Sequence, residues 1–189
     1  MNILHEFEYF KPKSKEEAME LGKKLGSKAK FLAGGTDLLI MMKEKMIKPD
    51  AIIDISDLEE LKGIKCEEGK GAEICACTKI ADIESSKELK KKYPALTYAA
   101  SQLGSNQVRV MATLGGNSCH SSPAAETPAP LSALGAKVVV AGLDGEREMS
   151  MEDFIHGNRK NDLKEGEILY KFVLPEPAKH SACRYGHIG

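Results

Sequence analysis

Leu32-Ala33-Gly34-Gly35-Thr36-Asp37-Leu38-Leu39 places two consecutive glycines between two apolar runs. The run before the glycines, residues 30–33, predicts a short strand, and the run after them predicts a helix. Because glycine has no Cβ, the backbone N–H groups at such a turn can converge and approach a ligand closely, and the helix N-terminus adds partial positive charge. The stretch suits a phosphate or pyrophosphate, but a tight strand-to-helix turn without a ligand explains the same residues.

Two common nucleotide-binding motifs do not match this stretch. No Gly-Lys-Ser/Thr follows the glycines, which excludes a mononucleotide phosphate loop. The Gly-x-Gly-x-x-Gly fingerprint of dinucleotide-binding folds is also missing. Any phosphate chemistry here therefore belongs to another fold.

A second double glycine lies in Thr113-Leu114-Gly115-Gly116-Asn117. Ser122-Pro123 then predicts a helix over residues 122–134, with Ser122 as the N-cap and Glu126 in the first turn. Thr113, Asn117, His120 and Glu126 could contact a ligand in this second loop. A carboxylate in a first helical turn is favourable even without a ligand, so Glu126 alone does not indicate a site.

The remaining pattern divides the chain into an α/β part and a part with antiparallel hairpins. Residues 14–25 predict a helix capped by Ser14, and residues 51–55 a buried strand, so residues 1–56 form a unit of parallel character. Beyond it, residues 64–66 with 73–76 and residues 137–141 with 146–149 predict two hairpins. Helices are expected over residues 86–93 and 95–103, and a last strand over residues 167–174.

Composition limits the classes of function. The chain has 189 residues with 27 Lys and Arg against 28 Asp and Glu, a formal charge of −1, so no nucleic-acid partner is expected. No apolar run approaches the roughly 20 residues that span a bilayer. The opening residues lack a basic and then apolar leader, and the five cysteines are irregularly spaced. We therefore expect a cytoplasmic protein with no membrane span and no disulfide scaffold.

Cys119 and His120 are neighbours, but no further Cys or His lies at ligand spacing, so a metal site is not expected. Adjacent side chains rarely face each other, which argues against a Cys–His nucleophile. The five cysteines also lack the spacing of an iron–sulfur cluster.

Three motifs in series resemble one family, the FAD-binding medium subunits of molybdenum hydroxylases, which includes xanthine dehydrogenase and carbon monoxide dehydrogenase. They are Ala33-Gly34-Gly35-Thr36-Asp37-Leu38-Leu39, then Gln107-Val108-Arg109 leading to Thr113-Leu114-Gly115-Gly116-Asn117, and Ser122-Pro123-Ala124-Ala125-Glu126 with Pro128 and Leu131. Gly166-Glu167-Ile168-Leu169 extends the resemblance over nearly the whole chain.

The resemblance implies an α+β fold with two FAD-binding subdomains, of the vanillyl-alcohol oxidase or PCMH type, lacking the family's usual C-terminal domain. The subdomains would span residues 1–56 and 57–177, followed by a tail over residues 178–189. Carried over by position, the residues expected to bind FAD are Leu32, Ala33, Gly34, Gly35, Thr36, Asp37, Leu38, Leu103, Gly104, Thr113, Gly115, Gly116, Asn117, Cys119, His120, Glu126, Ile168 and Leu169. The family usually has aspartate where this chain has Glu126.

The function implied by the resemblance is electron transfer through FAD. Substrate would be oxidised on a molybdopterin-containing large subunit, and electrons would cross the [2Fe–2S] clusters of a small subunit to FAD and then to an acceptor such as NAD. No residue of this chain would be catalytic, since the flavin carries the chemistry. A flavin-free assembly or interaction module with the same fold is the alternative. A stand-alone flavin oxidase is a third reading, disfavoured because 189 residues leave no room for a substrate domain.

Overall fold

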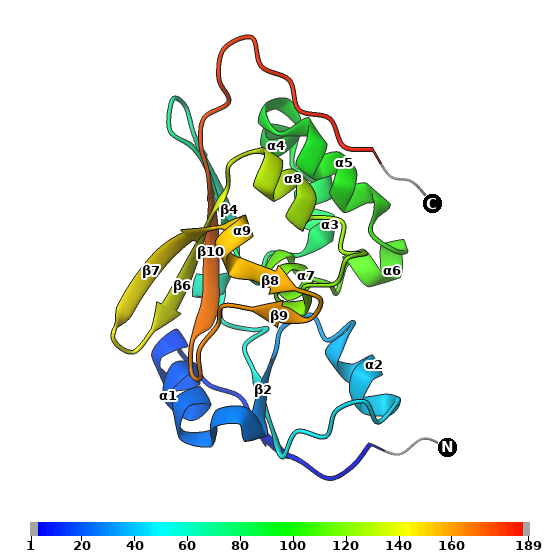
Figure 1. Ribbon diagram of the computed structural model, residues 1–189, viewed down its shortest axis with the longest axis vertical. Coiled ribbons are helices and arrows are strands. Elements are labelled where there is room, and N and C mark those ends of the chain that lie inside the picture. The colour runs from blue at the N-terminus through cyan, green and yellow to red at the C-terminus, as the bar shows by residue number, and fades with distance from the viewer. Residues whose placement is uncertain (1–3, 187–189) are drawn as a thin grey trace.

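A computed structural model describes residues 4–186 of the protein. The N-terminal part is a small parallel sheet with the strand order β1-β3-β2, seen in the lower half of Figure 1. Its elements are β1 (Glu8–Phe10), α1 (Lys15–Leu25), β2 (Ala29–Leu32), α2 (Leu38–Lys43) and β3 (Ala51–Asp54), with a short 3-10 helix at Gly26–Lys28. All four residues of β3 are buried, as expected for the central strand of a parallel sheet.

Capping residues define α1 as the sequence predicts. The Ser14 hydroxyl accepts a hydrogen bond from the Glu17 N–H at 3.2 Å, which makes Ser14 the N-cap. Gly26 ends the helix with a φ of +56°, a conformation that glycine adopts without steric cost.

A five-stranded antiparallel sheet forms the second part, with the order β4-β5-β10-β6-β7. Its strands are β4 (Ile64–Glu67), β5 (Gly71–Cys75), β6 (Lys137–Gly142), β7 (Gly145–Ser150) and β10 (Ile168–Leu174). A short two-stranded hairpin, β8 (Ile155–Gly157) with β9 (Lys160–Asn161), stands apart from this sheet. The two hairpins predicted from the sequence are β4–β5 and β6–β7.

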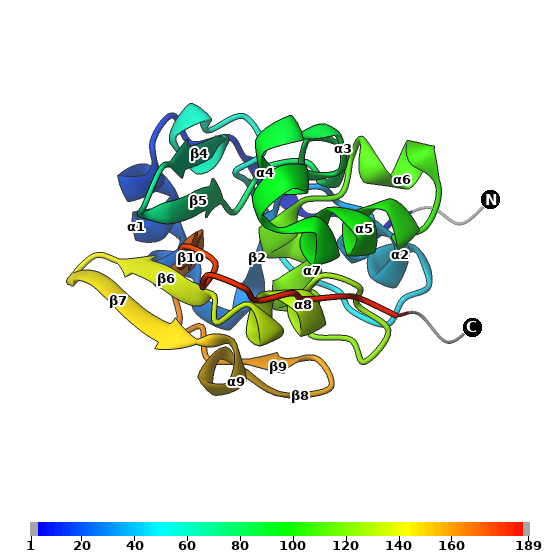
Figure 2. The ribbon, with the colours of Figure 1, turned by 90° about the horizontal axis from the view of Figure 1, so that it is seen from above.

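Helices gather on one side of the larger sheet, as Figure 2 shows. They are α3 (Ile80–Ser85), α4 (Lys87–Lys92), α5 (Pro94–Gln102), α6 (Asn106–Arg109), α7 (Leu114–His120), α8 (Pro128–Ala133) and α9 (Met151–Phe154), and a 3-10 turn, Glu59–Leu61, precedes β4. Together with the two sheets they make the α+β architecture that the sequence indicated.

Two clusters of buried side chains hold the fold together. The larger one lies between the five-stranded sheet and its helices and includes Ile74, Leu96 and Phe172. The smaller one joins the two sheets, because it contains Ile53 of β3 together with Ile168 of β10. The two sheets therefore share apolar packing rather than being linked only by the chain.

The helix predicted over residues 122–134 is wrong in its first half. The observed helix, α8, begins at Pro128, after Thr127 as its N-cap. Proline has no N–H and clashes with the preceding turn, so Pro128 and Pro130 are compatible only with the start of a helix. Ser122 instead closes a local turn, in which its hydroxyl accepts a hydrogen bond from the Ala124 N–H at 3.2 Å. Glu126 therefore precedes the helix and is not in its first turn.

The second double glycine is also not the loop that the sequence suggested. Gly115 and Gly116 lie within the first turn of α7, whose N-cap is Thr113. Helix α7 ends at Ser121, which has a left-handed φ of +49°. Among the residues that the structure describes, no helix is both long and apolar enough to cross a membrane.

Candidate functional site

A cleft of about 1010 Å³ lies between the small sheet and the larger unit. One wall comes from the segment after β2 and from α2, and the other from α7 and the start of β10, elements that face each other in Figure 1. Fifteen of the eighteen residues predicted to bind FAD line it: Ala33, Gly34, Gly35, Thr36, Asp37, Leu38, Leu103, Thr113, Gly115, Gly116, Asn117, Cys119, His120, Ile168 and Leu169. Residues far apart in the sequence are thus brought to one hollow.

The first glycine segment, residues 33–38, leaves donors available at the cleft. Within residues 4–186 the N–H groups of Gly35, Thr36 and Asp37 donate to no protein acceptor. Gly35 has a φ of +74°, and a Cβ there would come within 3.1 Å of the Leu32 and Leu39 side chains. These residues form a turn whose unpaired N–H groups can receive an anionic oxygen.

Gly34 has a different role, which is close packing between the two parts of the fold. A Cβ on Gly34 would clash with the carbonyl oxygen of Met111 and lie 2.9 Å from the Ala112 Cα. Because both neighbours are backbone atoms, they cannot move aside as a flexible side chain can. Gly34 therefore fixes how the first glycine segment rests on residues 111–112.

The second glycine segment, residues 113–117, uses its N–H groups inside the protein. The Leu114 N–H donates to Thr78 O at 3.1 Å, and the Gly115 N–H donates to Ala76 O at 2.8 Å. The Gly116 N–H donates to the Thr113 hydroxyl at 3.1 Å. The segment forms a wall of the cleft but does not offer a row of unpaired backbone donors.

Polar side chains connect the cleft walls. The Nε2 atom of His120 lies 3.7 Å from Oδ1 of Asp37, so the C-terminal end of α7 approaches the first glycine segment. The amide oxygen of Asn117 accepts hydrogen bonds from the hydroxyl of Thr127 at 2.6 Å and from its N–H at 3.2 Å. That oxygen is thereby committed to the protein, and the orientation of the Asn117 side chain is fixed.

Three of the predicted residues do not line the cleft. Leu32 belongs to β2. Gly104 occupies the turn between α5 and α6 with a φ of +49°. Glu126 accepts a hydrogen bond from the Tyr185 hydroxyl, near the end of the described chain.

Residues 159–169 form another part of the cleft, and within them only Gly166-Glu167-Ile168-Leu169 belongs to a stretch noted in the sequence. It is attached to the end of α7 by two hydrogen bonds: the Arg159 N–H donates to Ser121 O at 2.9 Å, and the Asn161 side chain donates to Cys119 O at 2.7 Å. Arg159 is itself left-handed, with a φ of +56°. Sequence reasoning had marked Gly166 to Leu169 in this segment, with only Ile168 and Leu169 as FAD contacts. It missed residues 159–165, since their attachment joins residues about forty positions apart.

The thiols at the cleft are poorly suited to chemistry. Burial raises the pKa of the Cys119 thiol to about 12 and that of Cys77 to about 12, so neither forms much thiolate at neutral pH. No group of three or more His, Cys, Asp or Glu suitable for a metal occurs among the described residues. The described residues of the cleft therefore provide groups that can bind a ligand.

Comparison with known proteins identifies the family. The family described as "FAD binding domain in molybdopterin dehydrogenase" matches residues 5–177. The nicotinate dehydrogenase FAD-subunit of Eubacterium barkeri is 37% identical over 186 residues, covering 96% of this chain and 62% of that protein. The carbon monoxide dehydrogenase medium chain of Hydrogenophaga pseudoflava is 38% identical over 179 residues, covering 95% of this chain and 62% of that protein. The chain belongs to the molybdopterin dehydrogenase FAD-binding domain family.

A solved structure supports the same fold. Carbon monoxide dehydrogenase from Hydrogenophaga pseudoflava, in a form that lacks the Mo-pyranopterin moiety of the molybdenum cofactor, superimposes with a TM-score of 0.90 at 37% identity. The match covers 94% of this chain and 61% of that one. This FAD-binding domain therefore spans about three fifths of the length of the relatives it matches.

The residues of this FAD-binding domain fit the family's cofactor. The three unpaired N–H groups of the first glycine segment suit a pyrophosphate, and the φ of +74° at Gly35 allows the tight turn that leaves them unpaired. Leu103, Ile168 and Leu169 add apolar surface to the cleft. Ligand sites commonly combine a mainly apolar lining with a few well-placed polar groups, and this cleft does so.

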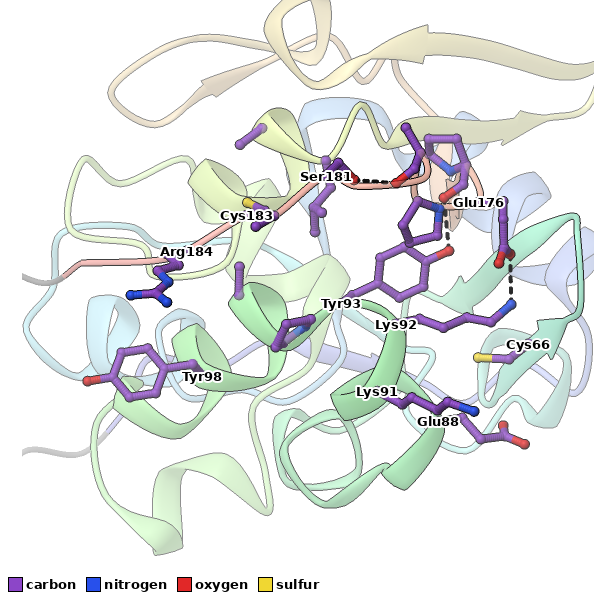
Figure 3. Close-up of a pocket in the computed structure, with 18 of the residues that line it drawn as sticks. Cys66, Glu88, Lys91, Lys92, Tyr93, Tyr98, Glu176, Ser181, Cys183 and Arg184 are labelled. Carbon is purple, nitrogen blue, oxygen red and sulfur yellow. Dashed lines mark hydrogen bonds and ion pairs between the residues drawn. The ribbon is translucent and has the colours of Figure 1, made fainter.

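A second hollow, of about 1320 Å³, has another character (Figure 3). It lies beneath residues 175–185 and contains none of the eighteen predicted residues. Some of its polar side chains are engaged within the protein: Lys92 Nζ is 2.7 Å from Glu176, and the Tyr93 hydroxyl donates to Pro175 O at 2.9 Å. This hollow therefore lacks the residues that are expected to bind FAD.

Proposed function

We propose that this chain is the FAD-binding, electron-transferring part of a molybdenum hydroxylase complex. FAD supplies the redox chemistry when bound, by accepting electrons and passing them on. The single observation that supports the proposal best is the turn at Gly35, Thr36 and Asp37, where unpaired N–H groups line a cleft large enough for a ligand.

The chain's own residues would bind and orient the cofactor. We propose that residues 33–38 hold the pyrophosphate, with the segment 113–120 as the opposite wall. Leu103, Ile168 and Leu169 would pack against the flavin and exclude water from it. No acid or base of this chain is assigned a catalytic role.

The proposed partners follow from the relatives. We propose a molybdopterin-containing large subunit and a [2Fe–2S] small subunit as the source of electrons, and NAD or another soluble acceptor as their destination. All five cysteines are unpaired thiols, which supports a reducing compartment such as the cytoplasm.

The test is a titration of the purified chain with FAD, followed by visible absorption and thermal unfolding. We expect one FAD per chain, bleaching of the bound flavin by dithionite, and weaker binding of riboflavin, which lacks the pyrophosphate. If the folded chain does not bind FAD, the result would instead favour the hypothesis of a flavin-free assembly module. Co-expression with the large and small subunits of a related complex then tests the electron path.

A further inference from the structure

Arg109 is a buried cation that does not line the cleft. It ends helix α6 and is 9% exposed. Its Nε atom donates to Glu84 Oε2 of α3 at 2.7 Å, and its Nη2 atom donates to the Asn106 side chain. Its Nη1 atom donates to two carbonyls, Leu103 O at 3.2 Å and Gly104 O at 3.1 Å. One guanidinium therefore connects α3, the turn after α5, and α6.

The turn that Arg109 holds forms part of the cleft wall. Leu103 lines the cleft, while Gly104 next to it has a left-handed φ of +49°. Because the guanidinium is planar and its donors have fixed directions, it constrains both carbonyls at once. A lysine ammonium at this place could not reproduce that geometry.

Helix α3 and the residue before it also hold the other end of this segment. Lys79 Nζ donates to Met111 O at 3.1 Å, and the Ile80 N–H donates to Ala112 O at 2.9 Å. Met111 and Ala112 are the residues against which Gly34 packs without room for a Cβ. Residues 103–112 therefore form a bracket, fixed at both ends to the α3 region, that touches both the cleft wall and the first glycine segment.

We infer that Arg109, held by Glu84, is a positioning residue for the FAD cleft: it sets the Leu103 wall and the backbone on which the first glycine segment rests. This inference rests on the proposed FAD function. Arg109 would act through the bracket and not by touching the cofactor, since its own side chain lies outside the cleft lining.

The experiment uses the full chain with Arg109→Lys, Arg109→Met and Glu84→Gln. Lys92→Met is the matched control, because it breaks a partly buried ion pair with Glu176 away from the cleft. Each variant is measured for thermal unfolding, FAD affinity and the visible circular dichroism of the bound flavin. We expect Arg109→Lys to weaken FAD binding by at least about tenfold, equivalent to about 1.4 kcal/mol, and to change the dichroism.

Glu84→Gln keeps an oxygen acceptor, so its effect should be smaller than that of Arg109→Lys. The control should lose thermal stability and keep the wild-type affinity and dichroism. If folded Arg109→Lys binds FAD with the wild-type affinity and dichroism, the positioning role is wrong and the residue only stabilises the fold.

A readout without cofactor keeps this inference separate from the proposed function. Amide hydrogen exchange of the FAD-free Arg109→Lys chain should become faster at Leu39 and Met41, whose N–H groups donate to Gly35 O and Asp37 O, and in residues 109–112. It should stay unchanged in β6 and β7. Uniformly faster exchange, or no change at Leu39 and Met41, would contradict the bracket. Failure of the wild-type chain to bind FAD would overturn the proposed function and the role of Arg109 toward the cofactor, whereas the exchange result would still test the bracket itself.

Discussion

The two segments share a pair of consecutive glycines but differ in the hydrogen bonding of their backbone. In the first segment the N–H groups of Gly35, Thr36 and Asp37 donate to no acceptor within the described chain, and all three residues line the cleft. At Gly115-Gly116 the N–H groups donate to Ala76 O and to the Thr113 hydroxyl. The second pair begins a helix, whereas the first leaves N–H groups unpaired, and on the proposed function these would receive the pyrophosphate. A shared double glycine therefore does not imply a shared role.

The largest effect is expected from Gly35→Val. Its φ of +74° costs a β-branched residue about 1–3 kcal/mol, and the side chain would crowd the turn proposed to hold the pyrophosphate. FAD retention should be abolished, measured by absorbance after gel filtration. Gly69→Val is the control, since Gly69 has a φ of +76° and open space around it. Equal FAD content in the two variants would show that the turn at Gly35 is not the binding site.

The next effect is on stability rather than on FAD, and comes from Gly115→Ala. Its Cβ would lie 2.6 Å from the Ala76 Cβ and 2.9 Å from Ala76 O. Overpacking of this kind costs about 1–3 kcal/mol, so the Tm should fall by about 3–10 °C. FAD bound per folded molecule should remain close to wild type. Loss of FAD with an unchanged Tm would reverse the roles assigned to the two segments.

A smaller effect is expected from Thr113→Ala, which removes the N-cap of α7. Loss of such a cap costs about 1 kcal/mol, or about 2–4 °C in Tm for a chain of this size. Differential scanning calorimetry measures it, with Ser86→Ala, the N-cap of α4, as the matched case. If Thr113→Ala weakens FAD binding and Ser86→Ala does not, the Thr113 hydroxyl contributes to ligand binding as well as to capping the helix.

The smallest effect on FAD affinity is expected at Cys119, two residues beyond the second glycine segment. Because burial raises the pKa of its thiol to about 12, we expect almost no alkylation by iodoacetamide at pH 7.5. Mass spectrometry after a timed exposure gives the labelled fraction, and Cys119→Ser should leave FAD affinity unchanged. Rapid labelling of Cys119 in the folded chain would mean that its thiol ionises more readily than its surroundings imply.

Much of the fold could be predicted because local patterns determine it. Continuous apolar residues at 51–53 marked the central parallel strand, and the Gly142 to Gly145 turn marked a hairpin. The helix start predicted at Ser122-Pro123 is wrong. Pro128 and Pro130, which favour a helix start at Pro128, are the better signal in this stretch. Fifteen of the eighteen predicted residues reached the cleft, since they sit on motifs carried by its walls.

The features that the sequence did not predict depend on contacts between residues far apart in the chain. Nothing in Gly115-Gly116 itself reveals that Ala76 accepts its hydrogen bond, about forty residues away. The attachment of Arg159 to Ser121 and the bracket around Arg109 are likewise set by the packing of separate elements. Such contacts can be identified only from the folded structure.

Amide hydrogen exchange with and without FAD tests the difference between the two segments most directly. The amides of Gly35, Thr36 and Asp37 should exchange freely in the FAD-free chain and become protected when FAD binds. Those of Leu114, Gly115 and Gly116 should be protected before FAD is added and change little. New protection confined to residues 114–117, with residues 35–37 unaffected, would contradict the account.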